Sequence, residues 1–242
     1  MSSNRQRKLD AVVARLQDRY GPRAIRKAAP PQTRVPRLAT TFPALDAALD
    51  GGLPVGRITE VCGQATSGKA TLAAKTLASA QQQAEAIAAW LDLPRACDGE
   101  YLHLCGLDLA RLLVVQPGDA TDGLAITRYL LESQTLAALV FDSTAELEKA
   151  DPALVAASLE QLAILTAQSP TALIFLSEPR AQLPALAHVA AIRLMLRHEQ
   201  WIARGRDVRG YTAQVTVVKH RLGREGITVP IRVMFNGTVR GE

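Results

Sequence analysis

Aromatic side chains are scarce in this sequence, making up 4% of its 242 residues. This shortage argues against an aromatic-rich surface for stacking bases. The three cysteines include no CxxC pair, which excludes a disulfide scaffold and predicts a reducing, cytoplasmic setting. Cys97, His103 and Cys105 lie close in sequence, but their spacing fits no common zinc template.

Long apolar runs are also missing. No stretch approaches the 18 or so consecutive apolar residues of a transmembrane helix, and the basic N-terminus has no apolar signal segment. We therefore expect no membrane partner. Apolar residues nevertheless make up 48% of the chain, enough to bury a substantial core.

The net charge of +5 is unevenly distributed. Residues 1–37 carry a net charge of about +8, residues 38–192 about −9, and residues 193–242 about +6, counted from Lys, Arg, Asp and Glu. Two basic ends around an acidic centre favour an anionic partner, with nucleic acid first. Solvated basic faces with no partner are the alternative.

The first 37 residues read as a tethered helix. An apolar stripe over residues 5–20 has helical spacing and ends before Gly21; it consists of Leu9, Val12, Val13, Leu16 and Tyr20. Residues 28–37 contain three prolines and predict an extended linker. We therefore divide the chain into 1–37, the helix and linker, and 38–242, the main domain.

The main domain predicts an α/β fold. Apolar strands alternate with helices, which indicates βαβ units and a mainly parallel sheet. The strands are expected at 57–62, 86–91, 112–116, 136–141 and 171–176, and the helices at 40–49, 69–83, 100–110, 118–133 and 154–167. Shorter alternating segments at 192–196, 212–219 and 229–235 predict an antiparallel extension of the sheet.

The segment GQATSGK, from Gly63 to Lys69, follows a predicted strand and opens a helix. This is the context of a phosphate-binding loop, in which backbone N–H groups, here including those of Ser67 and Gly68, and the lysine bind phosphates. The next residue should carry the hydroxyl that binds Mg²⁺, but it is Ala70. Thr71 follows, rotated by about 100° along the helix. A glycine-rich turn that has lost its ligand is the alternative.

Asp142 ends the apolar run LAALVFD. A carboxylate at the end of such a strand holds Mg²⁺ beside a phosphate-binding loop. The alternative is an aspartate that caps the strand end or the following helix.

The residues 45–72, LDAALDGGLPVGRITEVCGQATSGKATL, resemble the start of the bacterial RecA recombinase core. The similarity continues through 112–124, 140–144, 172–178 and 215–222. It implies a RecA-like core that binds ATP and Mg²⁺, with an N-terminal helix that docks on an adjacent subunit. The chain is also similar in size to the ImuA-type accessory proteins of translesion mutasomes, and we expect it to lack the large RecA C-terminal domain.

Departures from the family pattern predict little ATP hydrolysis. Pro94 stands where the family has the glutamate that activates water, and a proline cannot accept a proton. Asp92, Asp98 or Glu100 would need a shifted loop to replace it. Glu178 replaces the glutamine that senses the γ-phosphate.

The family's two DNA-binding loops are also changed. Residues 145–153 are short and acidic, and 177–189 contain no glycine. DNA contacts are expected instead on the N-terminal helix and on four arginines: Arg204, Arg206, Arg209 and Arg224. The segment 204–210, RGRDVRG, is either a phosphate-contacting hairpin or an ordinary exposed turn.

Lys219 and Arg221 match two lysines that, in the family, reach the γ-phosphate bound by a neighbouring subunit. Both side chains are expected on one face of a strand. A basic edge strand that resists aggregation is the alternative.

These features predict a RecA-like accessory protein of DNA repair and recombination. It would bind ATP and Mg²⁺ weakly and associate with single-stranded DNA, a RecA filament or copies of itself. Two alternatives are an active ATPase stimulated by single-stranded DNA and a mutasome scaffold that binds no nucleotide.

Overall fold

The computed structural model describes residues 2–21, 35–82, 86–142, 144–180, 183–235 and 238–241. The chain forms two compact units, Met1–Val35 and Pro36–Glu242, which are considered separately here. Most of the predicted linker, residues 28–34, lies outside the described residues. None of the described helices is long and apolar enough to span a membrane.

The first unit contains one helix, α1 (Ser2–Tyr20), which ends at Gly21 as predicted. Gly21 has a φ of 92° and donates its N–H to the carbonyl of Gln17, a helix-ending geometry that glycine adopts readily. Leu9 and Val12 are 53% and 52% exposed. The apolar stripe therefore has little cover within its own unit.

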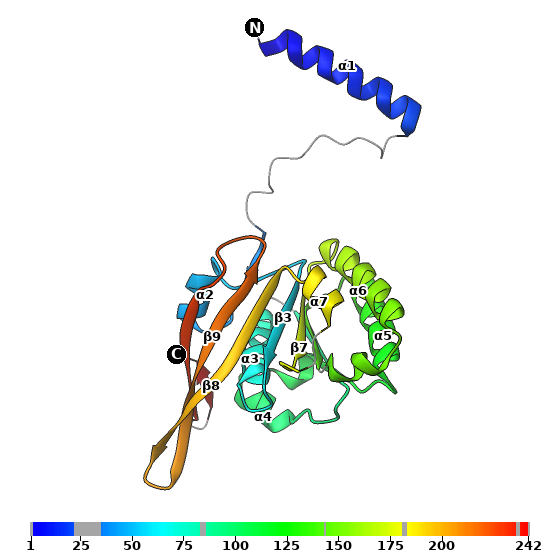
Figure 1. Ribbon diagram of the computed structural model, residues 1–242. Coiled ribbons are helices and arrows are strands. Elements are labelled where there is room, and N and C mark those ends of the chain that lie inside the picture. The colour runs from blue at the N-terminus through cyan, green and yellow to red at the C-terminus, as the bar shows by residue number, and fades with distance from the viewer. Residues whose placement is uncertain are drawn as a thin grey trace. The chain divides into compact units, whose positions relative to one another are not determined.

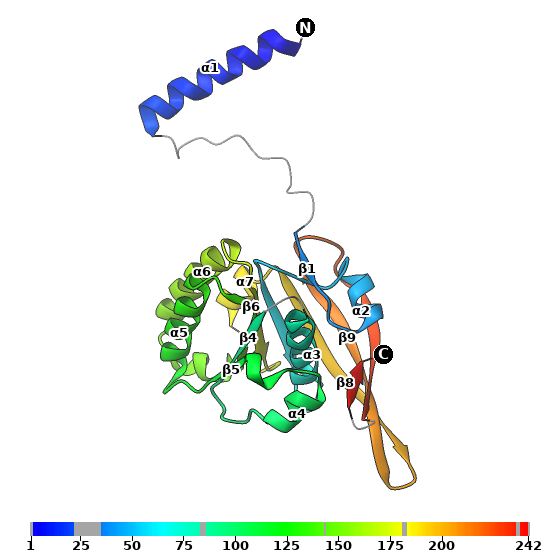
Figure 2. The same ribbon diagram turned by 180° about the vertical axis from the view of Figure 1, so that it is seen from behind.

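The second unit is built on a nine-stranded sheet with the strand order β11-β10-β9-β8-β3-β7-β6-β4-β5 (Figures 1 and 2). The strands are β3 (Ile58–Gly63), β4 (Ile87–Asp92), β5 (Leu112–Val115), β6 (Leu136–Asp142), β7 (Ala172–Ser177), β8 (Ile192–Arg204), β9 (Asp207–His220), β10 (Thr228–Phe235) and β11 (Val239–Gly241). Strands β8, β3, β7, β6, β4 and β5 pair in parallel, and β9, β10 and β11 extend the sheet antiparallel. The predicted α/β architecture is confirmed. The segment 192–196, expected in the antiparallel extension, instead pairs in parallel with β3 as the start of β8.

Helices cover both faces of this sheet. The helices are α2 (Pro43–Ala48), α3 (Lys69–Gln81), α4 (Gly99–Leu104), α5 (Ala120–Glu132), α6 (Pro152–Ala167) and α7 (Pro184–Val189). One core cluster joins α2, α3 and α4 to the sheet, and a second joins α5, α6 and α7. Two short strands, β1 (Arg37–Leu38) and β2 (Leu53–Pro54), form a separate antiparallel pair.

The helix predicted at 100–110 is present but is shorter than predicted. Helix α4 ends at Leu104, a turn follows at Gly106 with a φ of 99°, and a 3₁₀ turn spans Leu109–Arg111. Asp108 caps that turn by accepting the N–H of Ala110 at 3.0 Å. A glycine in the left-handed region cannot continue a helix at low cost, so the periodic pattern breaks there.

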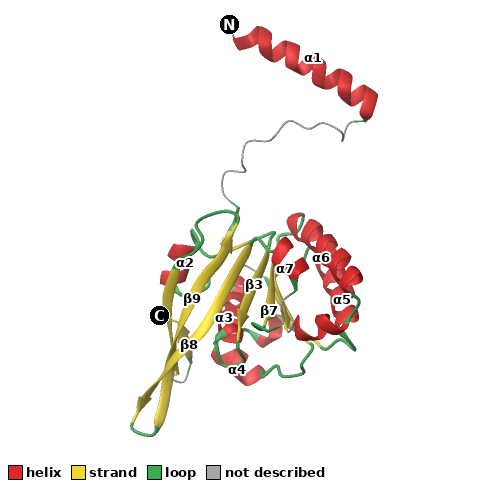
Figure 3. Cartoon of the chain, viewed as in Figure 1, coloured by secondary structure: helices red, strands yellow, loops and turns green. Residues whose placement is uncertain are grey.

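The strands predicted at 192–196 and 212–219 are much longer in the structure. β8 and β9 pair from Ile192↔His220 to Arg204↔Asp207 and form one long hairpin, whose tip extends past the neighbouring strands (Figure 3). Register shifts at 193/194, 198/200 and 202/203 interrupt the alternation of apolar and polar residues. These bulges explain why the pattern predicted only the inner parts of both strands.

The two segments expected to replace the family's DNA loops contain short helical elements. Residues Thr144–Lys149 form a 3₁₀ segment after β6, and α7 lies within 177–189. Residues 143 and 181–182 lie outside the described residues.

Candidate functional site

The glycine-bounded loop joins the central strand β3 to helix α3. Gly63 is the last residue of β3 and Lys69 the first of α3. Gly68 has a φ of 90°, and a Cβ on Gly63 would lie 2.2 Å from Ser67 Oγ. Both positions therefore require glycine, and the loop delivers the free N–H groups of an α-helix N-terminus to one place.

Two polar side chains of the loop, those of Ser67 and Lys69, are placed where they could bind an anion. Lys69 is 6% exposed, donates to the carbonyl of Gly63 at 2.9 Å and lies 3.6 Å from a carboxylate oxygen of Glu178. The hydroxyl of Ser67 is buried and has no hydrogen-bond partner among the described residues. A phosphate in the loop would give the Ser67 hydroxyl a partner and Lys69 a further anionic one, so these residues fit the phosphates of a nucleotide.

The fit to Mg²⁺ is incomplete. Ala70 has no oxygen to offer. Thr71 does not replace it, because its hydroxyl lies 2.7 Å from Tyr101 Oη and accepts a hydrogen bond from Tyr211 Oη at 3.0 Å. Asp142 is the protein oxygen ligand left for a metal at the phosphates.

Asp142 ends β6, beside Asp92 at the end of the paired strand β4. The pKa of Asp142 is raised to about 6 from an ordinary value of 3.8, chiefly by burial and also by the charge of Asp92, while the charge of Lys69 acts in the opposite direction. A cation near Asp142 would favour its ionised form, as expected of a metal ligand.

Two of the three carboxylates considered as replacements for the family's glutamate, Asp92 and Asp98, are engaged in hydrogen bonds within the loop after β4, whereas Glu100 is exposed in the first turn of α4. Asp92 is fully buried and accepts hydrogen bonds from the N–H groups of Ala96 and Cys97 and from Gln116. Asp98 accepts the N–H of Tyr101 at 3.1 Å and caps α4. Both side chains are occupied in shaping the loop that carries Pro94.

An apolar pocket of about 270 Å³ lies near the start of α3. Its lining residues are Tyr101, Leu104, Phe235, Thr238 and Val239. The hydroxyl of Tyr101 reaches Thr71, two residues after Lys69. A nucleotide whose phosphates occupy the loop would have an aromatic-lined pocket within reach of its base. Motif reasoning missed this pocket, because its residues are far apart in the sequence.

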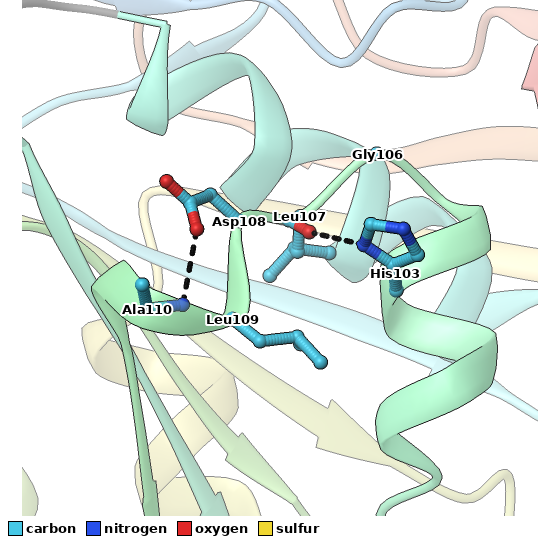
Figure 4. A pocket seen from close by; sticks show the side chains of 6 residues that line it. All are labelled: His103, Gly106, Leu107, Asp108, Leu109 and Ala110. Carbon is cyan, nitrogen blue, oxygen red and sulfur yellow. Dashed lines mark hydrogen bonds between the residues drawn. The ribbon is translucent and has the colours of Figure 1, made fainter.

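A second, shallower hollow of about 570 Å³ lies at the turn between α4 and β5 (Figure 4). His103 Nδ1 lies 3.4 Å from the carbonyl of Leu107, and Asp108 accepts the N–H of Ala110 (Figure 4). Gln81 also accepts the N–H of Asp108 at 2.9 Å. These groups are paired with one another and maintain the turn, so the hollow has no chemistry of its own.

The strands at the site are linked by a buried ion pair that sequence reasoning also missed. Glu60 on β3 pairs with Arg193 on β8 and accepts a hydrogen bond from Ser177 on β7 at 2.8 Å. Burial raises the pKa of the neighbouring Cys62 thiol; the charge of Glu60 adds to this effect, whereas Ser177 and Arg193 oppose it. Three adjacent strands are thereby fixed in register beneath the loop.

Lys219 lies in β9 and Arg221 follows the last residue of that strand, His220; both side chains reach the same carbonyl, that of His188. Lys219 Nζ donates to the carbonyls of Ala187 and His188 at 2.6 and 3.0 Å, and Arg221 also donates to the carbonyl of His188. Both cations therefore bind the C-terminal end of α7.

The four arginines expected to contact DNA do not form one group. Arg204, Arg206 and Arg209 lie around the tip of the β8–β9 hairpin, whereas Arg224 lies in the turn at the other end of β9. Among the stripe residues of α1, Val13 and Leu16 are half-buried, while Leu9 and Val12 are exposed. His, Cys, Asp and Glu side chains form no cluster of three that could hold a metal within the described residues.

Comparison with known proteins gives one consistent result. The sequence profile of the RecA N-terminal domain matches residues 7–153. Protein RecA of Herpetosiphon aurantiacus is 29% identical, with 100% of this chain and 75% of the relative aligned. Protein RecA of Synechocystis sp. is 32% identical, with 91% and 70% aligned. A crystal structure of the RadB recombinase superposes with a TM-score of 0.65 at 22% identity, over 81% of this chain and 96% of that one.

Proposed function

Because the chain belongs to the RecA family, we propose that it is an accessory protein of DNA recombination and repair that binds a nucleotide but hydrolyses it slowly. The phosphates would lie on the loop 63–69, and the base in the pocket of Tyr101 and Phe235. Mg²⁺, when bound, would neutralise phosphate charge, and Asp142 would hold it.

The observation that carries this proposal is the hydroxyl of Thr71. It is bound to Tyr101 and Tyr211, and Ala70 supplies no replacement, so the metal loses one protein ligand. Pro94 supplies no base, and Asp92 and Asp98 are engaged in the loop. Losing a metal ligand and a general base each costs orders of magnitude in rate. Phosphate binding depends on backbone N–H groups and Lys69, which are retained.

The test measures thermal unfolding and phosphate release on the same preparation. We expect ATP to raise the melting temperature of the chain, because a ligand bound only to the folded state stabilises it. Lys69→Ala should abolish this shift, whereas Lys149→Ala, at an exposed lysine paired with Glu146, should retain it. Phosphate release should stay near background with and without single-stranded DNA.

Two outcomes would overturn the proposal. Phosphate release that rises with single-stranded DNA and disappears in Lys69→Ala would show an active ATPase. A melting temperature that no nucleotide changes would show a scaffold without nucleotide binding.

We propose in addition that the chain associates with DNA or with a RecA-type filament through its basic regions. The support is the positive charge at the two ends of the sequence and the arginines at the hairpin tip. Co-sedimentation with RecA filaments on single-stranded DNA should retain the chain at low salt and release it as salt rises. Failure to co-sediment at any salt concentration would count against this association.

A further inference from the structure

The outer part of the β8–β9 hairpin, residues 198–209, stands apart from the rest of the sheet, and we name it the hairpin arm. Strand β3 pairs with β8 only between Ile192 and Leu196, and β10 pairs with β9 only from Gly210 onwards. At Trp201 the arm still has β10 beside its β9 partner Tyr211, but β8 has no neighbour on its other side there. Beyond the pair Ile202↔Gly210 the arm is a two-stranded ribbon, and Figures 1 and 3 show it projecting beyond the neighbouring strands.

The arm displays an aromatic side chain. Trp201 is 54% exposed, whereas the chain's other tryptophan, Trp90, is 2% exposed. Trp201 packs edge-on against Tyr211 at a centroid distance of 5.7 Å and against His198 at 4.8 Å. These rings support the indole from one side and reduce its freedom, while half of its surface remains open to a flat ligand.

Positive charge lies further along the same arm. Arg204 and Arg206 lie at the turn, three and five residues from Trp201, and neither forms an ion pair with any residue that the structure describes. Arg209 makes only a long contact of 3.4 Å with Asp207. The arm thus carries both guanidinium groups and an open aromatic face, the two kinds of group that bind single-stranded nucleic acid.

We propose that the hairpin arm binds single-stranded nucleic acid by stacking a base on Trp201, with Arg204 and Arg206 at the neighbouring phosphates. This proposal rests on the proposed association with DNA and names its site and strand preference. A duplex is disfavoured because its bases are stacked on each other and their faces are unavailable to an indole. An acidic peptide would engage the arginines without requiring a flat ring.

The experiment compares three ligands on the intact chain: an oligo-dT, an abasic oligonucleotide of the same length, and a duplex. Fluorescence anisotropy of the labelled ligand gives affinity, and tryptophan fluorescence reports stacking, since Trp90 is buried. We expect oligo-dT to bind about tenfold more tightly than the abasic strand and to quench the exposed tryptophan. ATP alone should not quench it.

Variants separate the two parts of the site. Trp201→Leu should weaken oligo-dT binding about tenfold and leave the abasic strand unaffected, which removes the preference. Arg204→Gln with Arg206→Gln should weaken both strands alike and reduce the salt slope by about 1 to 2. Val208→Ser, at an exposed apolar residue of the same arm, is the matched control and should change neither strand. Circular dichroism checks that each variant is folded.

Equal affinity for oligo-dT and the abasic strand, unchanged in Trp201→Leu, would overturn base stacking and leave the DNA association standing. Competition by polyglutamate as effective as that of oligo-dT would show a general anion surface and also overturn the proposal. Absence of binding to all three ligands would overturn both the arm's role and direct DNA association. Nucleotide binding at the loop, measured by the thermal shift, is independent of each of these results.

Discussion

Ala70 lacks the hydroxyl that a site for phosphates and a metal ion normally has at this position. It follows Lys69 in the first turn of α3, where a hydroxyl would reach a metal at the phosphates. We predict that Ala70→Thr increases the affinity for ATP in Mg²⁺ about tenfold and has little effect in a chelator, because the new oxygen acts through the metal. Calorimetric titration with and without Mg²⁺ measures both values.

The matched control for that prediction is Ala70→Val, which adds similar bulk and no hydroxyl. If the valine variant gains as much affinity as the threonine variant, packing of the helix start explains the gain. An equal gain in the chelator would also contradict a metal-mediated effect.

Asp142 makes the stability of the chain depend on pH. Its pKa is raised to about 6 in the folded state, so its ionised form is disfavoured there relative to the unfolded chain. This penalty is absent below about pH 4, grows between pH 4 and pH 6, and is complete above pH 6. We predict that Asp142→Asn raises the free energy of unfolding by about 3 kcal/mol at pH 8 and has little effect at pH 4.

Urea unfolding in the presence of a chelator, at a series of pH values, measures this difference. Asp18→Asn, at an exposed residue of α1, serves as the control and should show no such dependence. A stabilising effect of Asp142→Asn that is the same at pH 4 and pH 8 would refute the titration and indicate a packing effect.

At the scale of elements, α7 depends on cations that arrive from β9. This six-residue helix ends at carbonyls that accept from Lys219 and Arg221. Cations at a helix C-terminus satisfy free carbonyls and interact favourably with the helix dipole. We predict that Lys219→Met with Arg221→Met speeds hydrogen exchange of the α7 amides at least severalfold, as measured by mass spectrometry, and leaves α5 unchanged.

The control is Arg232→Met, which removes one cation from the neighbouring strand β10. It should leave hydrogen exchange of the α7 amides unaltered. If exchange rises equally in α5 and α7 after the double substitution, the cations stabilise the whole unit, and the local role is refuted. Unchanged exchange in α7 would contradict it as well.

Several elements could be predicted because their sequence signals are local. The run LAALVFD becomes β6, buried between β4 and β7, and the Ala-rich helix after Lys69 becomes α3. The length of β8 and β9 could not be predicted, since three register shifts interrupt their alternation. Register shifts depend on pairing between strands and leave no period-2 pattern to find.

The phosphate-binding loop could likewise be identified from its glycine spacing, but its surroundings could not. The hydroxyl of Thr71 meets Tyr101, 30 residues away, and Tyr211, 140 residues away. Composition alone argued against an aromatic-rich surface, yet the fold gathers His198, Trp201 and Tyr211 around the start of the hairpin arm. The few aromatic side chains of this chain form a cluster because the pairing of β8 with β9 brings them together, and composition does not report such pairing.

At the scale of the whole molecule, the charge blocks of the sequence follow structural units. The basic residues 1–37 include α1, and the basic residues 193–242 include the hairpin arm and the end of β9. The acidic block, 38–192, contains the phosphate-binding loop and most of the parallel sheet. The basic residues thus lie on elements other than those of the acidic block, which holds the phosphate-binding loop. This separation favours one anionic partner at the basic elements and a different one, the nucleotide, at the loop.

The apolar stripe of α1 requires cover that its own unit does not provide. An isolated helix of 19 residues is marginally stable in water, and Leu9 and Val12 are more than half exposed. We predict that the stripe docks on another subunit, so that Leu9→Glu with Leu16→Glu shifts the chain to monomers or abolishes mixed assembly with RecA. Light scattering at several concentrations measures the shift. Ala11→Glu with Ala14→Glu adds the same charge at two exposed positions of α1 outside the stripe and should preserve assembly. Loss of assembly in this variant would show that charge, rather than the stripe, controls association.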